Sequence, residues 1–327
     1  MKIKTLKFSL IGLVVIALFL PLGCKKKTET PANTSQNDQT GTTEADAGMS
    51  DVNDYINNKI GGGANARVAA TAAYNLPCGI IKVDSTTSGA ITTYNLHYGG
   101  QTPCGYKYKS GQISFALVSG SSFSQQGAVV SITFISYTVT VEATGSVVIL
   151  NGTIYDKNIT GGYLWQVVLD DATVKHQLRG QLEITYANGA VRPVNYYQLR
   201  TWSSTGGWPG LSFSVAGDTA IGGYTSVMQT GNSYDNNYAY VTNASTPFLW
   251  SNCGTTYAGP YVLEQAEATM YLTVPGISPA NIDIQGGYDW NYAVSSSTPA
   301  LTQDCSSNAY KITLNVGSTT QTSYQLY

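Results

Sequence analysis

Only two histidines occur in the chain, His97 and His176, so any mechanism that needs a histidine base must use one of them. His176 lies in the segment Val-Lys-His-Gln-Leu-Arg, whose alternating polar positions are typical of a β-strand. No Gly-x-Ser-x-Gly nucleophile motif, P-loop or dinucleotide-binding motif occurs. We therefore expect His176 to be an exposed or hydrogen-bonded strand residue rather than a catalytic base.

Carboxylate chemistry of the glycosidase type needs two acidic side chains about 5–10 Å apart. The scattered candidates are Glu142, Asp156, Glu183, Asp235, Asp283 and Asp289. No spacing singles out a pair, and we expect Asp170-Asp171 to form a solvated turn rather than a calcium site. We predict no catalytic residues, and a carboxylate-dependent hydrolase is the weakest of the functions considered.

Four cysteines remain when Cys24 is set aside, and an even number in an exported chain favours disulfides. Cys78 and Cys253 are each followed by Gly, and each opens a strand-rich segment that ends in another cysteine. Of the three pairings that four cysteines allow, we therefore predict Cys78–Cys104 and Cys253–Cys305. A zinc site requires a Cys-x-x-Cys motif or histidines close to the cysteines, and neither occurs. We predict no metal and no cofactor.

The aromatic content suggests a binding chemistry. Five tryptophans and 24 tyrosines stand among many Asn, Gln and Ser residues, and flat aromatic faces beside amide groups can stack on sugar rings. The commoner use of such residues is core packing and cross-strand pairing. Trp208, in a Gly/Pro loop, is the best single candidate for ligand binding, and Tyr234, Tyr238 and Tyr240 come next.

The N-terminus carries an export signal. A basic start is followed by 15 uncharged residues, 8–22, which is short for a membrane span of about 20 residues and typical of a signal peptide. Gly23-Cys24 follows, and a small residue before this cysteine resembles the bacterial lipoprotein signal, in which the cysteine becomes the acylated N-terminus. An uncleaved anchor and an ordinary signal peptide are the alternatives. We expect Cys24 to hold the protein on a membrane.

The overall composition excludes several classes of protein. Charged residues make up 11% of the chain, against about 25% in an average soluble domain, which disfavours a helical bundle. A formal net charge of −2 disfavours nucleic-acid binding through a basic field. The absence of a Gly-X-Y period excludes collagen.

Three regions are predicted along the chain. Residues 1–23 are the signal peptide, and 24–66 hold the acylated cysteine, a solvated tether to about residue 48 and a short helix. That helix has Ser50 as its N-cap and Val52, Ile56 and Ile60 on one face. Residues 67–327 form a single all-β domain, because apolar residues alternate with polar ones there.

The alternation predicts a sandwich or a wide curved antiparallel sheet of many short strands, with at most one short N-terminal helix. The phase slips after Phe134, which predicts a β-bulge, and Asn188-Gly189 predicts a hairpin turn. Asn151-Gly152 is either a turn or a strand in which Gly permits close packing. Further strands are expected near 162–169, 196–202, 211–216, 223–229, 236–242, 261–274, 281–294 and 309–316.

Three segments resemble uncharacterised lipoproteins of the Bacteroidetes: 95–113, which surrounds Cys104, the region 182–202, and 305–312. The resemblance covers roughly residues 76–317 and implies an all-β exported lipoprotein with no established activity. In that phylum an acidic run after the cysteine accompanies export to the cell surface. This chain has three lysines there, which favours the periplasmic face of the outer membrane.

These observations lead to one functional expectation and its alternatives. We expect an envelope lipoprotein that is held on the outer membrane by Cys24 and has a non-catalytic structural or adhesive role. The main alternative is a glycan-binding module that uses exposed Trp and Tyr side chains. The expected partners are the membrane and, under that alternative, a glycan, with no nucleic acid.

Overall fold

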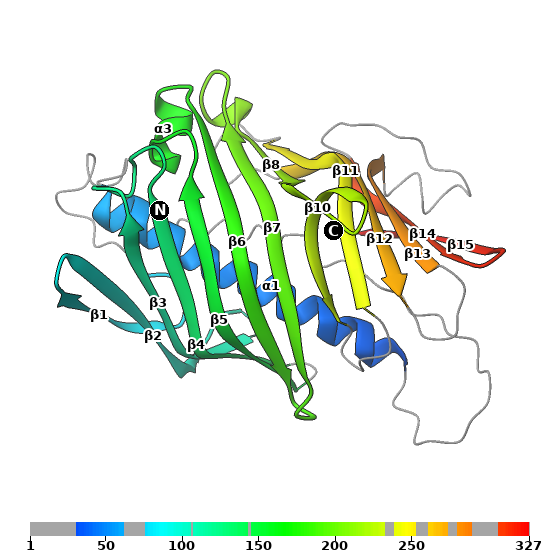
Figure 1. Ribbon diagram of the computed structural model, residues 1–327, viewed down its shortest axis with the longest axis horizontal. Coiled ribbons are helices and arrows are strands. Elements are labelled where there is room, and N and C mark those ends of the chain that lie inside the picture. Colours follow the sequence, from blue (N-terminus) through cyan, green and yellow to red (C-terminus); the bar gives the residue numbers. More distant parts are fainter. Residues whose placement is uncertain are drawn as a thin grey trace.

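A computed structural model describes residues 31–61, 76–105, 107–142, 145–232, 239–252, 261–273, 280–289 and 307–326. The fold is a single 15-stranded antiparallel sheet crossed by one long helix (Figure 1). The predicted all-β class is confirmed, and of the two expected architectures the wide curved sheet forms rather than the sandwich. None of the helices in the described part of the chain is both long enough and apolar enough to cross a bilayer.

Seven strands follow one another as a meander and make up the first half of the sheet. They are β1 (Ile80–Ser88), β2 (Ile91–Pro103), β3 (Lys107–Ser119), β4 (Val129–Val141), β5 (Ser146–Asn158), β6 (Thr173–Tyr186) and β7 (Val191–Ser203). The segment 162–169, expected to be a strand, is instead helix α3 (Leu164–Leu169). The Gln166 side chain accepts the N–H of Tyr163 at 2.7 Å and so caps that helix, which buries Val167 and Val168.

The second half of the sheet continues from β7 to β10 and runs to the C-terminal strand. Its strands are β8 (Ser212–Gly217), β9 (Thr219–Ile221), β10 (Tyr224–Asn232), β11 (Ala239–Asn252), β12 (Tyr261–Thr273), β13 (Ala280–Asp289), β14 (Ser307–Val316) and β15 (Thr319–Leu326). The short β8 pairs with β7 and β11, and β9 pairs with β10.

The predicted bulge after Phe134 is confirmed. The pairing of β4 with β5 shifts between Phe134 and Tyr137, and Ser136 between them has a φ of 47°. On the neighbouring strand, Gly111 makes room, because a Cβ there would lie 2.1 Å from the carbonyl oxygen of Ser136. The bulge changes which side chains of β4 face the core. Tyr137 therefore points inward and is one of the largest fully buried side chains.

The two Asn-Gly pairs take different roles. Gly189 has a φ of +80° in the turn between β6 and β7, as predicted for a hairpin. Gly152 lies inside β5, where a Cβ would approach the carbonyl oxygen of Gln181 to 2.5 Å. The second pair is therefore a strand segment in which glycine permits close packing.

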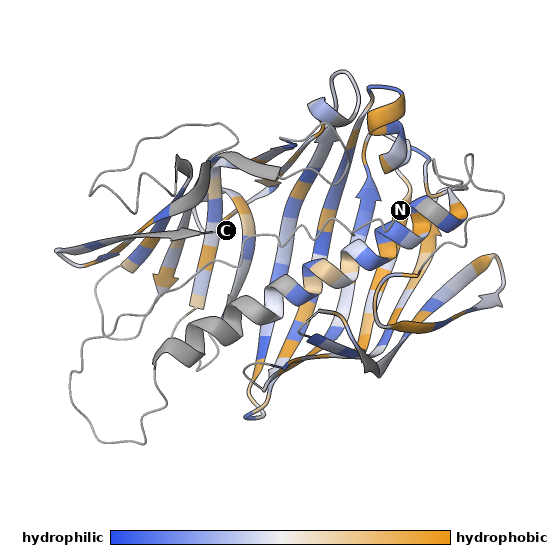
Figure 2. Ribbon diagram, turned by 180° about the vertical axis from the view of Figure 1, so that it is seen from behind, coloured by the Kyte–Doolittle hydropathy of each residue, from blue (hydrophilic) through white to orange (hydrophobic). Residues whose placement is uncertain are grey.

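Helix α1 (Pro31–Tyr55) runs across one face of the sheet, and a π-helical turn, η1 (Ile56–Ile60), extends it (Figures 1 and 2). We call this the inner face and its opposite the outer face. The prediction of a solvated tether to residue 48 was therefore wrong. A Cβ on Gly41 would lie 2.8 Å from Ile184, and one on Gly48 would lie 2.6 Å from Phe134. Small residues thus bring the helix backbone against the sheet, and they gave the segment its low hydrophobicity.

The core lies between α1 and the inner face. Ala45, Met49 and Val52 of the helix are fully buried there with the large side chains of the sheet, including Phe134 and Tyr196. A second cluster fills the inner face of the C-terminal half and contains Phe213, Val215, Phe248, Trp250, Met270 and Ile282. Helix α1 is therefore part of the domain rather than a spacer before it.

Candidate functional site

Acidic residues of helix α1 are buried against the sheet and meet basic residues from its strands. The pairs are Glu44–Lys107, Asp46–Arg200 and Asp51–Lys109. We call this set the helix seat. Arg200 Nη2 donates to Asp46 Oδ1 at 2.7 Å and to Gln198 Oε1 at 2.9 Å, and both charged side chains are under 10% exposed. Each charge is paired because a lone buried charge would be costly.

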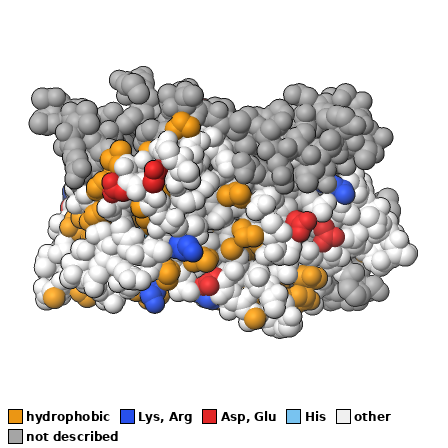
Figure 3. Space-filling model, turned by 90° about the horizontal axis from the view of Figure 1, so that it is seen from above, with side chains coloured by type: hydrophobic (Ala, Val, Ile, Leu, Met, Phe, Trp, Pro, Cys, Tyr) orange, Lys and Arg blue, Asp and Glu red, His pale blue; other side chains and the backbone are white. Residues whose placement is uncertain are grey.

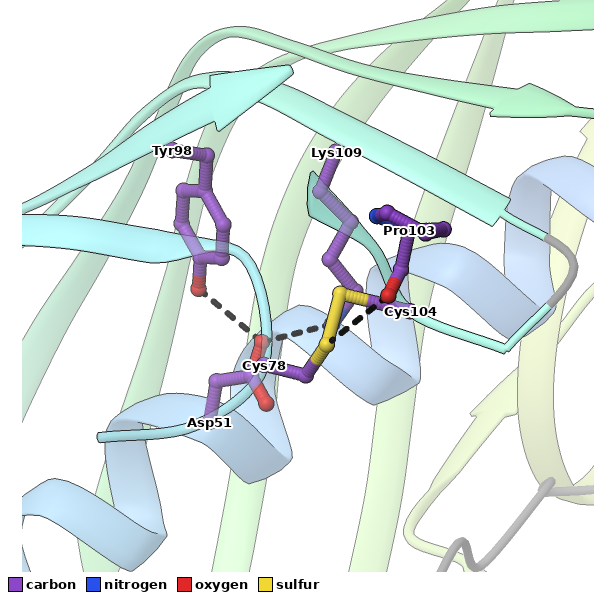
Figure 4. The surroundings of a disulfide bond; sticks show 6 residues. All are labelled: Asp51, Cys78, Tyr98, Pro103, Cys104 and Lys109. Atoms are coloured by element: carbon purple, nitrogen blue, oxygen red, sulfur yellow. Dashed lines mark hydrogen bonds and ion pairs between the residues drawn. A yellow bond between two sulfur atoms is a disulfide. The ribbon is translucent and has the colours of Figure 1, made fainter. Parts of the chain in front are cut away.

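Asp51 forms the centre of the seat beside the disulfide (Figure 4). Its Oδ2 accepts hydrogen bonds from Lys109 Nζ at 2.8 Å and from the Tyr98 hydroxyl at 3.0 Å. Cys78 and Cys104 form the predicted disulfide next to this group, with their Cα atoms 5.6 Å apart. The cross-link joins the segment before β1 to the end of β2, under the helix. Cys253 and Cys305 lie outside the described residues.

Burial shifts the ionisation of this group. It raises the pKa of the Asp46 and Asp51 carboxyls, against the opposing effect of Arg200 and Lys109 respectively. The pKa of Asp54 rises to about 7, first because of burial and second because of the neighbouring Asp51 charge. Burial also raises the pKa of the Tyr98 hydroxyl well above its usual value. A carboxylate of the helix seat therefore stays charged in the interior only when its basic partner is present.

His176 is a hydrogen-bonded strand residue, as predicted. Its Nδ1 lies 3.0 Å from Asp156 Oδ2, and its Nε2 is buried with no partner among the described residues. The pair borders a cavity of about 20 Å³ that Asn53, Asn158 and Tyr163 also line. Such a cavity has room for about one water molecule. It does not accommodate a substrate, and no Ser, Thr or Cys side chain lines it.

The aromatic residues singled out in the sequence are not brought together into one described site. Trp208 opens a short 3₁₀ helix, η2 (Trp208–Gly210), in a loop whose Gly206 N–H donates to the Asp171 carboxylate at 3.0 Å. Asp171 is therefore a turn residue that holds this loop. Tyr234 and Tyr238 lie outside the described residues. Tyr240 packs against the second core cluster, and its hydroxyl accepts from Gln229 Nε2 at 2.9 Å.

A row of side chains that are polar at every position except Val241 crosses the outer face, and no pattern within a single strand reveals it. Residues directly opposite in antiparallel strands share a face, so the pairings trace one line through every strand of the main path. The line is Asp84, Asn95, Ser114, Thr133, Thr153, Gln181, Asn195, Thr230, Val241, Tyr271, Asn281, Asn315 and Thr320. We call it the outer-face row. Polar residues alternate with apolar ones in each strand, but only the register shows that they align.

Hydrogen bonds run along the outer-face row. The hydroxyls of Thr133 and Thr153 are 3.0 Å apart, Gln181 Nε2 donates to Asn195 Oδ1 at 3.0 Å, and Asn195 Nδ2 donates to Thr230 Oγ1 at 3.1 Å. Hydroxyl and amide groups keep further donors and acceptors after these bonds. The result is an ordered, mostly uncharged hydrogen-bonding surface.

Charged side chains are sparse elsewhere too. On the face seen from above, the described residues show isolated charges among uncharged side chains (Figure 3). Within the described ranges, no group of three or more His, Cys, Asp or Glu side chains is placed to hold a metal ion. Comparison with protein-family models, curated proteins and solved structures finds no match for this chain.

Proposed function

We propose that the chain is an outer-membrane lipoprotein, anchored through Cys24 and facing the periplasm, with a non-catalytic adhesive role in which the outer face binds a glycan. The observation that carries the proposal is the outer-face row. Sugar hydroxyls both donate and accept hydrogen bonds, as do the Thr, Asn and Gln side chains of the row. Strands about 4.8 Å apart repeat these groups across the sheet, which suits an extended chain of sugars.

The two faces of the sheet differ in what covers them, which indicates different roles. The inner face is filled by α1, whose acidic residues are paired with Lys107, Lys109 and Arg200. Among the residues that the structure describes, no helix covers the outer face of β3–β7 (Figure 1). A binding role therefore falls to the outer face.

The position of α1 also brings the domain closer to the membrane than a tether would. A solvated stretch from residue 25 to 48 would reach about 80 Å when extended. Helix α1 begins at Pro31, so a chain anchored at Cys24 reaches at most about 25 Å before the helix starts. This short reach suits a protein that holds a glycan near the envelope.

The binding test uses the full-length chain in detergent on a glycan array, with Gln181→Ala/Asn195→Ala as the row variant. Thr87→Ala, an exposed position away from the row, is the control. We expect the row variant to lose binding and the control to keep it. Absence of binding by the wild type would contradict the glycan role. Turnover of a glycan that disappears when one carboxylate becomes an amide would instead favour the hydrolase.

The anchoring test is separate. Cys24→Ala should abolish fatty-acid labelling and release the protein from the membrane fraction. Labelling that survives this substitution would contradict the lipoprotein assignment. The glycan-binding role would still be tested by the glycan array.

A further inference from the structure

A group of basic and aromatic side chains stands on the outer face where β5, β6 and β7 are paired. Tyr155 is opposite Arg179, and Arg179 is opposite Tyr197. Lys157 lies two positions from Tyr155 on β5, and Lys175 lies four positions from Arg179 on β6, so all five share the outer face. We call these five residues the basic–aromatic patch.

The patch has an excess of positive charge. Arg179 Nη2 donates to the Asp218 carboxylate at 2.8 Å and to its carbonyl oxygen at 2.7 Å, which offsets one cation. Arg179 Nε and Nη1 have no acceptor among the described residues. Lys157 and Lys175 likewise form no ion pair within the described ranges. Lys157 is exposed and Lys175 is half-buried, so the patch keeps two lysine charges that no described acidic group neutralises, in a chain whose net charge is −2.

The two aromatic residues have different roles: Tyr197 holds the Arg179 guanidinium, and Tyr155 offers an exposed ring. The Arg179 guanidinium lies over the ring of Tyr197, 5.2 Å from its centroid. Tyr155 is 48% exposed, and its hydroxyl has no partner in the described part of the chain. An exposed ring beside a fixed planar cation offers a stacking surface and hydrogen-bond donors together.

We propose that the basic–aromatic patch binds an acidic glycan, a sugar chain that carries carboxylate or sulfate groups. A sugar ring stacks on Tyr155, and the anionic groups meet Lys157, Lys175 and the free N–H groups of Arg179. This assignment rests on the proposed glycan-binding function and names the class of glycan.

The spacing of the cations favours a chain with several anionic groups over a single small anion. Lys175 and Arg179 are about 13 Å apart along β6, given about 3.3 Å per residue. Lys157 lies on the neighbouring strand opposite Gln177, the residue midway between them. A single carboxylate does not span this triangle, whereas a sugar chain with repeated anionic groups does.

The surroundings favour a glycan over a nucleic acid. Along the outer-face row the one charged residue is Asp84, which is paired with Lys82, so a continuous phosphate backbone would meet no unpaired cation of the row. Glu183 is exposed on the same face of β6, four positions from Arg179, and would repel any uniformly anionic chain, so it favours a glycan whose anionic groups are separated by neutral sugars. Hydroxyls and amides continue from the patch instead, which matches the uncharged parts of a sugar chain.

The test measures binding of the full-length chain in detergent to a neutral polysaccharide, a uronate polymer, a sulfated polymer and single-stranded DNA at two salt concentrations. The variants are Lys157→Gln/Lys175→Gln and Tyr155→Ala, with Lys59→Gln on η1 as an exposed control away from the outer face. Thermal unfolding of each variant checks that it is folded.

We expect the acidic polymers to bind more weakly at high salt. The double lysine variant should lose about tenfold in affinity, since exposed charges each contribute modestly. Tyr155→Ala should lose a similar factor for the sugar polymers, and the control should match the wild type. The uronate and sulfated arms distinguish the two anions.

Two results would overturn the assignment of an acidic glycan and leave glycan binding standing: binding of the neutral polymer alone, or acidic binding unaffected by the lysine variant. Equal or tighter binding of DNA through the same lysines would identify a nucleic-acid site instead. Silence toward every polysaccharide would contradict the proposed function itself.

Discussion

Asp51 on helix α1 and Lys109 on strand β3 form a buried ion pair, with Oδ2 and Nζ 2.8 Å apart. The two residues are 58 positions apart in the sequence, and the Tyr98 hydroxyl completes the coordination of the carboxylate. Removing both charges of a buried pair is often nearly neutral, but removing one leaves the other unpaired in the interior. The pair therefore specifies where the helix docks, and removal of only one of its two charges destabilises the fold.

Lys109→Met should lower the free energy of unfolding by about 3–5 kcal/mol, because it leaves the Asp51 carboxylate unpaired in the interior. The double variant Asp51→Leu/Lys109→Met should recover most of that loss. Denaturant unfolding measures both. Lys82→Met, which breaks the exposed pair with Asp84, is the control and should change stability by less than about 1 kcal/mol. Equal losses in the single and double variants would contradict this account.

Asp54 should make stability depend on pH. Its pKa in the folded state is about 7, above the unfolded value of 3.8, so the folded state binds the proton more tightly between these values. Stability contributed by this group is therefore present below about pH 4 and is lost as the pH rises through 7. Each pKa unit corresponds to about 1.4 kcal/mol, so the full effect is on the order of 4 kcal/mol.

The matching variant is Asp54→Asn, followed by unfolding at several values between pH 4 and 8. Its stability relative to the wild type should increase with pH across that window. Glu183→Gln, at an exposed strand position, should run parallel to the wild type. A constant difference between Asp54→Asn and the wild type would show that Asp54 does not titrate near 7.

Gly48→Ala should destabilise the protein, although glycine to alanine in an exposed helix normally stabilises by about 1 kcal/mol. The new Cβ would lie 2.6 Å from the Phe134 ring and 2.8 Å from Ile113, so the helix or the ring must move. Overpacking of this kind costs about 1–3 kcal/mol. Thermal unfolding measures the change, with Ser50→Ala as the comparison. A gain in stability for Gly48→Ala would mean that α1 does not contact the sheet there.

Cys253–Cys305 remains a prediction, and peptide mapping without reductant tests it. We expect two cross-linked peptides, Cys78–Cys104 and Cys253–Cys305. Replacing Cys78 and Cys104 with Ser should cost about 3–4 kcal/mol, because the bond closes a loop with a sequence separation of 26. A peptide that joins Cys78 to Cys305 would refute the pairing.

The sequence by itself determined the features that depend on neighbouring residues. Alternation with period two predicted the strands, the phase slip at Phe134 predicted the bulge, and Asn188-Gly189 predicted the hairpin. The order of the cysteines predicted Cys78–Cys104. Each of these signals acts over a few residues or over one hairpin, so each can be recognised before the chain is folded.

Only the tertiary structure decided where α1 lies and what the outer face presents. The segment before Ser50 has few apolar residues, because its contact with the sheet uses glycine and alanine and its acids pair with distant bases. Asp46, for example, meets Arg200 154 residues away. The outer-face row likewise depends on the register of every strand, and a shift of one residue would turn the polar side chains to the other face. These relationships exist only when strands far apart in sequence are paired, so no local pattern contains them.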